Sequence, residues 1–433
     1  QLEGYGTLQL GAEGCPLQSA GVTITLVGSK PQEATLTKGI IVRPGGVLDI
    51  HGKPYTPTWS RLRTTADAGS SAITLQDAVD WEVGQQVVVV TTRHGDMDES
   101  DHQNEVRTIT KVDGAIVHLD QPLYFLHYGG EEYQGEVGLL SRSITVQGDE
   151  QSEGDAFGGH VMCERGATCR ISYALGYRMG QMNRIGRYPF HFHLMGDVQH
   201  ESYFRGLVVL HSYFRAFTIH GTHNATLSSC VAYDIKGSAV YMEDGFEMDN
   251  NIEYNLIAHV LPIKPFQWPY YEYDAGDSEN LGDDQWVSPE PDRVVPADLT
   301  PACFYCTNQR NNWVGNVASG GFSGFIFPAT PYVLGESQVD APGFEPVRER
   351  GLEFDSNTAH SSGQYWIHGG CIYSGGMLLT PDPSNYSHYL YNYAKFPVKT
   401  PSISYPDIYR GEMTMTNTKL WGCSSGLLAW GVK

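Results

Sequence analysis

Three histidines and two carboxylates stand at spacings that can bring them together. His191 and His193 are two residues apart, so on a strand both side chains point to the same face. His220 follows His193 after 27 residues, and Glu243 and Asp244 follow His220 after 23 and 24 residues. If each interval is one turn of a repeating β structure, strands stacked about 4.8 Å apart place these groups in one ladder. The spacing therefore predicts a single site.

This group of side chains permits several kinds of chemistry. Neutral imidazoles beside a carboxylate bind transition metals, so His191, His193 and His220 are candidate metal ligands. A histidine and a carboxylate could instead be general base and general acid on a glycan. Glu243 and Asp244 could also flank a glycosidic bond as a carboxyl pair, and a lyase would need a base beside a uronate. The structural alternative is a histidine ladder that is only stacked and hydrogen-bonded.

Charged residues near the histidines are candidates for binding an anionic substrate. Arg184 and Arg187 precede His191 and could hold a uronate, and Asp197 could orient Arg187 or bind calcium. The acidic run at residues 96–101 also offers hard oxygens for calcium. That run lacks the glycine and the final glutamate of an EF-hand loop, so a solvated loop is the alternative.

The elements that would position these groups are short strands. From about residue 136 onward, apolar-polar-apolar segments recur every 20–30 residues or so, often beside Asn or Gly. Such a period indicates the stacked rungs of a solenoid, in which Asn side chains can form their own ladder. A β-sandwich would space its strands about 8–12 residues apart. The sequence therefore predicts an all-β fold, a right-handed parallel β-helix.

One segment interrupts the repeat. Residues 262–300 are rich in Pro, acidic and aromatic residues and predict a long excursion from the solenoid. Its aromatic side chains, among them Trp268 and Tyr270, could stack on sugar rings or fix the loop to the solenoid wall.

Charge and hydropathy exclude two classes of partner. The formal net charge of −21 argues against nucleic acid, because phosphate binding needs a basic surface. It leaves carboxylates for calcium, and a polyanionic substrate would need a local basic patch. No run of 18 apolar residues is present, so no membrane span is expected in this chain.

The cysteines indicate an oxidising compartment. Their even number, eight, fits disulfides, and Cys163 and Cys169 are close enough in sequence to pair. Cys303 and Cys306 resemble half of a redox or zinc site, but no second pair follows at zinc spacing. Two glycosylation sequons, one of them at Asn224, point to a secreted protein or the outer part of a surface protein.

Several runs resemble one family of secreted proteins. Residues 186–197 (GRYPFHFHLMGD) resemble its most distinctive motif, and residues 136–148, 214–224, 242–247 and 307–320 resemble strands in the same order. The family comprises the cell-migration-inducing hyaluronan depolymerase, its transmembrane relative and the fibrocystin-like proteins. The resemblance implies a small eight-glycine β domain at residues 1–125, stacked on a parallel β-helix at residues 126–433.

Three hypotheses for function follow. The first is an enzyme that cleaves an extracellular acidic polysaccharide of the hyaluronan kind, with Arg184 and Arg187 as anion clamp. The second is a structural or adhesive protein that associates with itself, because solenoids present long flat faces. The chain lacks the long insert of the hyaluronan-degrading members, which favours this fibrocystin-like branch. The third is a glycan-binding module without turnover.

Overall fold

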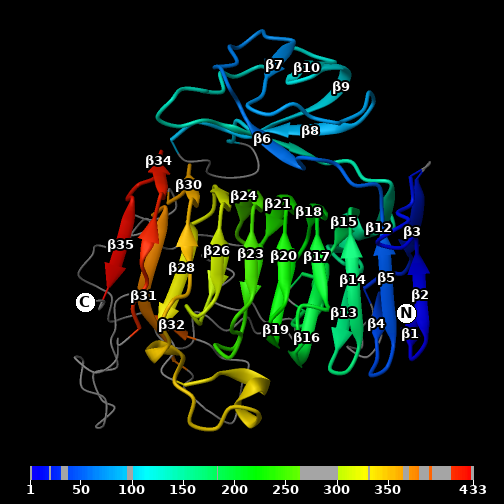
Figure 1. Ribbon diagram of the computed structural model, residues 1–433, viewed down its shortest axis with the longest axis vertical. Coiled ribbons are helices and arrows are strands. Elements are labelled where there is room, and N and C mark those ends of the chain that lie inside the picture. Colours follow the sequence, from blue (N-terminus) through cyan, green and yellow to red (C-terminus); the bar gives the residue numbers. More distant parts are fainter. Residues whose placement is uncertain are drawn as a thin grey trace.

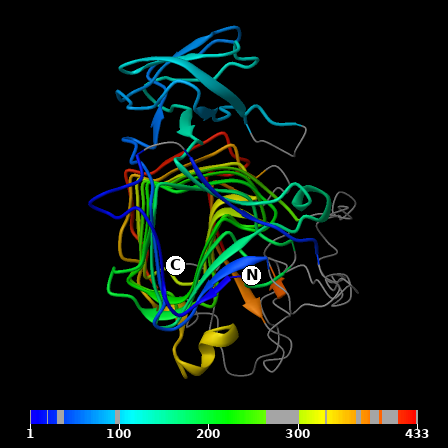
Figure 2. The same cartoon turned by 90° about the vertical axis from the view of Figure 1, so that its right-hand side faces the viewer.

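The chain winds into a coil of parallel strands, and a smaller antiparallel unit lies against one side of it (Figure 1). The computed structural model describes residues 2–18, 21–30, 38–94, 101–182, 184–263, 301–329, 332–363, 370–379, 390–392 and 411–430. Viewed along the coil, successive turns superpose and the antiparallel unit projects outside them (Figure 2). The predicted all-β parallel β-helix is confirmed.

Three parallel sheets form the faces of the coil. The first sheet contains β1 (Leu2–Gly4), β4 (Gly39–Val42), β13 (His160–Glu164), β16 (Phe190–Asp197), β19 (Phe217–His223), β22 (Val240–Met242), β25 (Ala302–Cys306), β28 (Ser323–Ala329) and β31 (Ile372–Leu379), which pairs with β35 (Leu427–Trp430) and antiparallel β32 (Leu390–Asn392). The second contains β2 (Thr7–Leu10), β5 (Val47–His51), β14 (Thr168–Ser172), β17 (Tyr203–Arg205), β20 (Thr226–Ser228), β23 (Asn251–Glu253), β26 (Asn312–Val314), β29 (Phe354–Asp355) and β33 (Met415–Thr416). The third contains β3 (Val22–Leu26), β12 (Ile144–Gly148), β15 (Ala174–Met179), β18 (Val208–Ser212), β21 (Val231–Lys236), β24 (Leu256–Leu261), β27 (Val317–Ser319), β30 (Thr358–His360) and β34 (Lys419–Trp421).

Helix is scarce in the described ranges. It is limited to single turns, which are α1 (Ser152–Asp155), η4 (Gly335–Val339) and η5 (Pro346–Arg348). Within those ranges, none of these turns has the length and hydropathy to cross a bilayer.

The antiparallel unit is inserted into the coil. Its strands are β6 (Trp59–Arg61), β7 (Ala72–Thr74), β8 (Gln86–Val89), β9 (Glu105–Asp113), β10 (Ile116–Leu119) and β11 (Glu136–Leu139). β4 pairs with β13 and β5 with β14, so the first two turns of the coil are built from β1–β5 and β12. The predicted boundary at residue 125 is therefore wrong. Similar strand and glycine patterns occur in both parts, and only long-range pairing distinguishes them.

Buried polar and aromatic contacts fix this unit to the third sheet. His360 Nε2 lies 3.0 Å from the Glu136 carboxylate, and both side chains are fully buried. Tyr133 stacks on Trp421 at 4.5 Å between ring centroids, and the Trp59 indole donates to the Tyr254 carbonyl. Because the His360–Glu136 contact is desolvated, it holds the unit to the coil more firmly than an exposed ion pair would.

Asparagine ladders run through the turns of the coil, as the sequence predicted. Asn255 donates through Nδ2 to Asn316 Oδ1 at 2.9 Å, and Asn316 donates to Asn357 Oδ1 at 3.0 Å. A second ladder joins Asn250 to Asn311. All five side chains are buried. The ladders satisfy backbone groups at corners where the strands end.

Asn316→Ala is expected to lower the free energy of unfolding by about 3 kcal/mol. The change leaves the Asn255 amide groups and the Ile252 carbonyl without their partners, and each buried unsatisfied group costs about 1–3 kcal/mol. Urea unfolding measures the loss. Asn312→Ala is the matched control, because Asn312 forms a similar amide contact at a half-buried position. Equal losses in the two variants would contradict the importance of burial.

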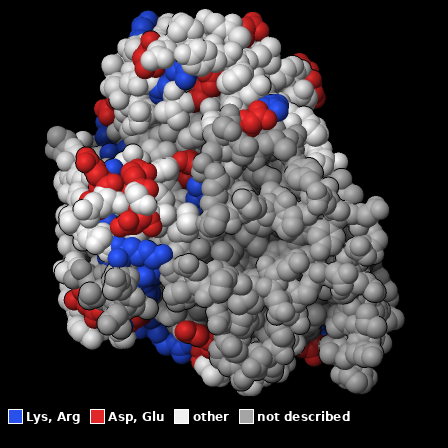
Figure 3. Space-filling model, turned by 180° about the vertical axis from the view of Figure 1, so that it is seen from behind, with Lys and Arg blue, Asp and Glu red and all other residues white. Residues whose placement is uncertain are grey.

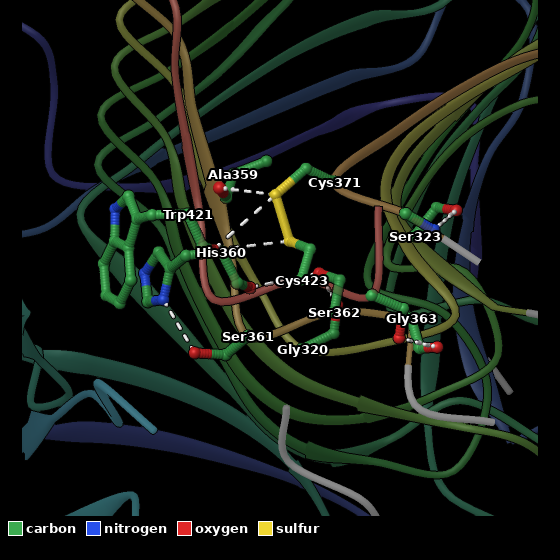
Figure 4. The surroundings of a disulfide bond; sticks show 12 residues. Gly320, Ser323, Ala359, His360, Ser361, Ser362, Gly363, Cys371, Trp421 and Cys423 are labelled. Atoms are coloured by element: carbon green, nitrogen blue, oxygen red, sulfur yellow. Dashed lines mark hydrogen bonds between the residues drawn. A yellow bond between two sulfur atoms is a disulfide. The ribbon is translucent and has the colours of Figure 1, made fainter. Parts of the chain in front are cut away.

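Two disulfides form within the described chain. The predicted pairing of Cys163 with Cys169 is confirmed, and Cys371 pairs with Cys423 across the last turns. Figure 4 shows this second bond beside the stacked rings of His360 and Trp421. Two disulfides fit an oxidising compartment.

The cysteine pair that resembled half of a zinc or redox site lies in the core. Cys303 and Cys306 are free thiols in β25, and burial raises the pKa of both. A buried thiol with a raised pKa is a poor nucleophile and a poor redox group.

The predicted excursion lies between two neighbouring turns. β24 ends at Leu261, and β25 begins at Ala302 and pairs with β22 in register. Residues 264–300, with Trp268 and Tyr270, lie outside the described residues.

Candidate metal centre

The strand β16 sorts aromatic and histidine side chains to opposite faces. Phe190 and Phe192 point into the coil and join its apolar core, while His191 and His193 point outward from the first sheet. β16 pairs with β19 so that His193 lies opposite His220. The 27-residue interval is therefore one turn of the coil, as the sequence predicted.

The three imidazoles converge on a small volume. Each offers one nitrogen, and these nitrogens lie within 4.8 Å of one another. His193 Nδ1 is 3.2 Å from His220 Nδ1, and the ring of His191 stacks parallel to that of His220 at 6.0 Å. His191 is fully buried, whereas the side chain of His193 is 24% exposed. The centre is therefore open to solvent beside His193.

The other nitrogen of each ring faces an oxygen. His191 Nδ1 lies 3.3 Å from the Gly186 carbonyl, and His220 Nε2 lies 2.7 Å from Asp244 Oδ2. His193 Nε2 lies 3.8 Å from the Glu336 carboxylate in η4. When each of these three ring nitrogens carries the proton of its neutral imidazole, the opposite nitrogen has a free lone pair for a metal. These nitrogens are Nε2 of His191 and Nδ1 of His193 and His220. Metal-binding histidines have this pattern of outer partners.

The donor set fits a transition metal. Tetrahedral ligands about 2.0–2.1 Å from an ion lie about 3.3 Å from one another, close to the 3.2 Å between His193 and His220. His191 Nε2 is buried and has no hydrogen-bond partner among the described residues. A buried polar atom left unpaired is costly, and an ion would satisfy it.

Electrostatics separate the three histidines. Burial, then the charges of His193 and His220, lower the pKa of His191. Burial, then the charge of His220, lower the pKa of His193 to about 3. Burial also opposes protonation of His220, but the Asp244 and Glu243 carboxylates outweigh it and raise that pKa to about 10. Without a metal, His220 alone among the three carries a proton at neutral pH.

Three carboxylates surround His220, and those of Asp244 and Glu247 are buried. Asp244 accepts hydrogen bonds from His220 and from the Ser337 backbone, so it orients the ring, whereas the sequence suggested one half of an acid pair. Glu243 Oε2 lies 3.9 Å from His220 Nδ1. Glu247 is fully buried, and burial and the charge of Asp244 raise its pKa to about 7.

The charges near His220 favour a divalent ion. Glu243 and Asp244 bring two negative charges, Glu247 brings a third above its pKa of about 7, and the described cations beside them are Arg215 and protonated His220. When Glu247 is ionised, a divalent ion that replaces the His220 proton makes this group neutral. Buried charge is stable only when it is balanced, so the carboxylates favour the ion.

The predicted substrate-binding residues Arg184, Arg187 and Asp197 have different surroundings. Arg187 is half-buried, and its charge contributes, after burial and His220, to the lowered pKa of His193. Arg184 packs over the Phe157 ring at 5.0 Å. Asp197 is exposed and accepts hydrogen bonds from Gln199 and Asn224. Asp197 therefore stabilises its own turn, and its predicted contact with Arg187 is replaced by these two.

Sequence reasoning missed three residues of the site. Arg215 is fully buried 3.8 Å from Glu243, Glu247 supports the Asp244 turn, and Glu336 reaches His193 from η4. Arg215 and Glu247 lie inside the runs 214–224 and 242–247 that resemble the family, and this resemblance could have identified them as candidates. Glu336 had no such signal.

The other candidate sites lie elsewhere. Of the acidic run proposed for calcium, residues 96–100 lie outside the described residues, and Asp101 pairs with Arg93. Acidic and basic side chains are interspersed on the described part of one face (Figure 3).

Glu247→Ala is expected to lower the free energy of unfolding by about 3 kcal/mol or more. Glu247 accepts hydrogen bonds from the backbone N–H groups of Gly221, Asp244 and Gly245, and each loses its buried partner. Urea unfolding measures the loss. Glu253→Ala, at a half-buried position on β23, is the control and is expected to change stability by less than about 1 kcal/mol.

Comparisons with known proteins agree with the fold and the motifs. The family model described as CEMIP beta-helix matches residues 156–367, and the model described as G8 domain matches residues 1–63. A G8 domain-containing protein of Dictyostelium discoideum is 40% identical over 98% of this chain and 30% of its own length. Fibrocystin-L of Homo sapiens is 33% identical over 84% of this chain and 9% of its own length.

The chain thus spans less than a third of these relatives. Among solved structures, the tailspike gp61 of Pseudomonas phage phi297 is 10% identical, with 85% of this chain and 50% of that chain covered. Its TM-score of 0.25 supports no conclusion about function. The two family models and the relatives match the same regions as the motifs, and the chain belongs to the family of proteins that join a G8 domain to a CEMIP-type β-helix.

Proposed function

We propose that the chain binds a divalent transition metal through His191, His193 and His220 and uses this centre to cleave an extracellular acidic polysaccharide. The observation that carries the proposal is the convergence of three imidazole nitrogens within 4.8 Å, each with an oxygen behind the opposite ring nitrogen.

The number of protein ligands supports a catalytic centre. Structural sites of this class have four protein ligands, whereas catalytic sites have three and an open position. When bound, the metal supplies Lewis acidity and an activated water. Glu243 lies beside the centre and can exchange a proton with a glycosidic oxygen or with water. Asp244 and Gly186 hold the rings of His220 and His191 in place.

The family and the setting of the centre support the substrate class. The family that the motifs resemble includes a hyaluronan depolymerase, and the disulfides fit an extracellular location. The centre is reached beside His193 and Glu336, whose side chains are 24% and 63% exposed. Arg187 adds positive charge next to this opening, which suits a uronate despite the acidic net charge.

Metal removal and restoration test the proposal. Purified protein is assayed for bound transition metal and for depolymerisation of hyaluronan, then stripped with a chelator and reloaded with Zn²⁺, Mn²⁺ or Cu²⁺ in separate samples. Neutral dextran is the control substrate. The proposal predicts hyaluronan cleavage that disappears with the metal and returns with one of these ions. Metal binding without turnover would overturn the catalytic part of the proposal, and neither metal nor turnover favours the structural and adhesive hypothesis.

A further inference from the structure

A fully buried arginine stands next to the histidine centre. The side chain of Arg215 is 0% exposed, and its guanidinium carbon lies 3.3 Å from the centroid of the Tyr241 ring. The rings of Tyr188 and Phe214 lie 4.5 and 4.9 Å from the same atom. Aromatic faces attract a cation, but they do not explain why a charge is buried here. An apolar side chain of similar volume in such a place is often neutral or stabilising.

The Glu243 carboxylate lies within reach of this buried charge. Its Oε2 atom lies 3.8 Å from Arg215 Nη1 and 3.9 Å from His220 Nδ1, so this oxygen stands between the arginine and the centre. The cluster of described side chains whose ligand atoms lie within 4.8 Å of one another contains the three histidines and not Glu243. Glu243 therefore lies near the centre but does not belong to this group of three candidate ligands.

We propose that Arg215 is a positioning residue that holds the Glu243 carboxylate beside His220 and outside the coordination shell of the metal. This inference rests on the metal centre of the proposed function. A carboxylate this close to a dication is attracted to it, and the arginine supplies the opposing attraction. The arrangement keeps one coordination position open for water or substrate and keeps Glu243 available for proton transfer.

The inference is tested with Co²⁺, whose visible absorption reports the number and kind of its ligands. The full chain is stripped of metal and titrated with Co²⁺ alone. Wild type and Glu243→Gln are expected to give the same spectrum. Arg215→Met is expected to change the spectrum and to bind Co²⁺ at least about tenfold more tightly, because the released carboxylate joins the dication. Arg215→Met/Glu243→Gln is expected to return to the wild-type spectrum.

A second aromatic-bound arginine gives the matched control. Arg205, on β17 of the second sheet, lies 4.5 Å from the Tyr203 ring centroid and 3.3 Å from Glu13. Arg205→Met is expected to leave the Co²⁺ spectrum unchanged. Arg215→Lys, which keeps the charge, is expected to keep the wild-type spectrum. Circular dichroism checks the folding of each variant, and Arg215→Gln replaces Arg215→Met if that variant fails to fold.

The outcomes separate the inference from the function on which it rests. A changed spectrum in Glu243→Gln alone would make Glu243 a ligand and overturn the inference. An unchanged spectrum in Arg215→Met, with only a lower melting temperature, would show that Arg215 is merely structural and also overturn it. Both results leave the metal centre intact. Failure of the wild type to bind Co²⁺ would remove the metal centre and the inference together.

Discussion

Replacing His191 and His193 together by alanine is expected to abolish stoichiometric binding of a transition metal while the coil stays folded. Two of the three imidazole nitrogens that converge within 4.8 Å are lost, and one remaining ligand cannot hold the ion. Both side chains point away from the apolar core, so Phe190 and Phe192 keep their packing. Elemental analysis after dialysis against Zn²⁺ is expected to fall from about one ion per chain to none.

The control for this change is the double variant His118→Ala/His211→Ala. His118 lies in the antiparallel unit, and His211 contacts Asp234 and Glu153 on the outside of the third sheet. This control variant removes the same number of histidines as the first double variant and is expected to keep the metal. Retention of one ion per chain in the His191 and His193 double variant would place the ion elsewhere, and loss of folding in circular dichroism would make that result uninformative about ligands.

Much of the architecture follows from local sequence. In residues 190–193 two phenylalanines alternate with two histidines, and this alternation assigns one pair to the core and the other to the outer face. The interval from His193 to His220 equals one turn, as the register of β16 and β19 shows. The boundary of the antiparallel unit could not be found in this way. β4 and β13 pair although Ile41 and Met162 are far apart in sequence, and no local pattern distinguishes such pairing from a hairpin.

The site, like the fold, was predictable from the sequence only in part. The spacing brought together the three histidines and Asp244, because His191 and His193 share one strand and His220 and Asp244 follow in the next two turns. It did not identify Glu336, which comes from a segment between β28 and β29 and reaches His193 from outside the coil. It also did not identify Arg215, because a buried arginine contradicts the usual rule that charged residues face solvent. The roles of Asp244 and Asp197 depended on hydrogen-bond partners that sequence does not specify.

The affinity of the centre for metal is expected to rise about tenfold for each pH unit across the neutral range, or about 100-fold from pH 6 to pH 8. In the metal-free protein the lowered pKa values of His191 and His193 leave both rings neutral at pH 6. The carboxylates of Asp244 and Glu243, against the effect of burial, raise the pKa of His220 to about 10. The ion must therefore displace one proton from His220 Nδ1, and this competition weakens only as the pH approaches about 10.

Calorimetry of Zn²⁺ binding in buffers of different ionisation enthalpy measures this proton directly. About one proton per ion is expected to be released at pH 7.5, whereas a site of ordinary imidazoles with pKa values near 6.5 would release almost none. Asp244→Asn removes the charge that lies 2.7 Å from His220, so it is expected to lower the pKa of that ring and to flatten the pH dependence above pH 7. A wild-type affinity that is constant above pH 7 would mean that His220 is already neutral there. The Asp244 contact would then orient the ring without holding its proton, and the ion would bind without displacing one.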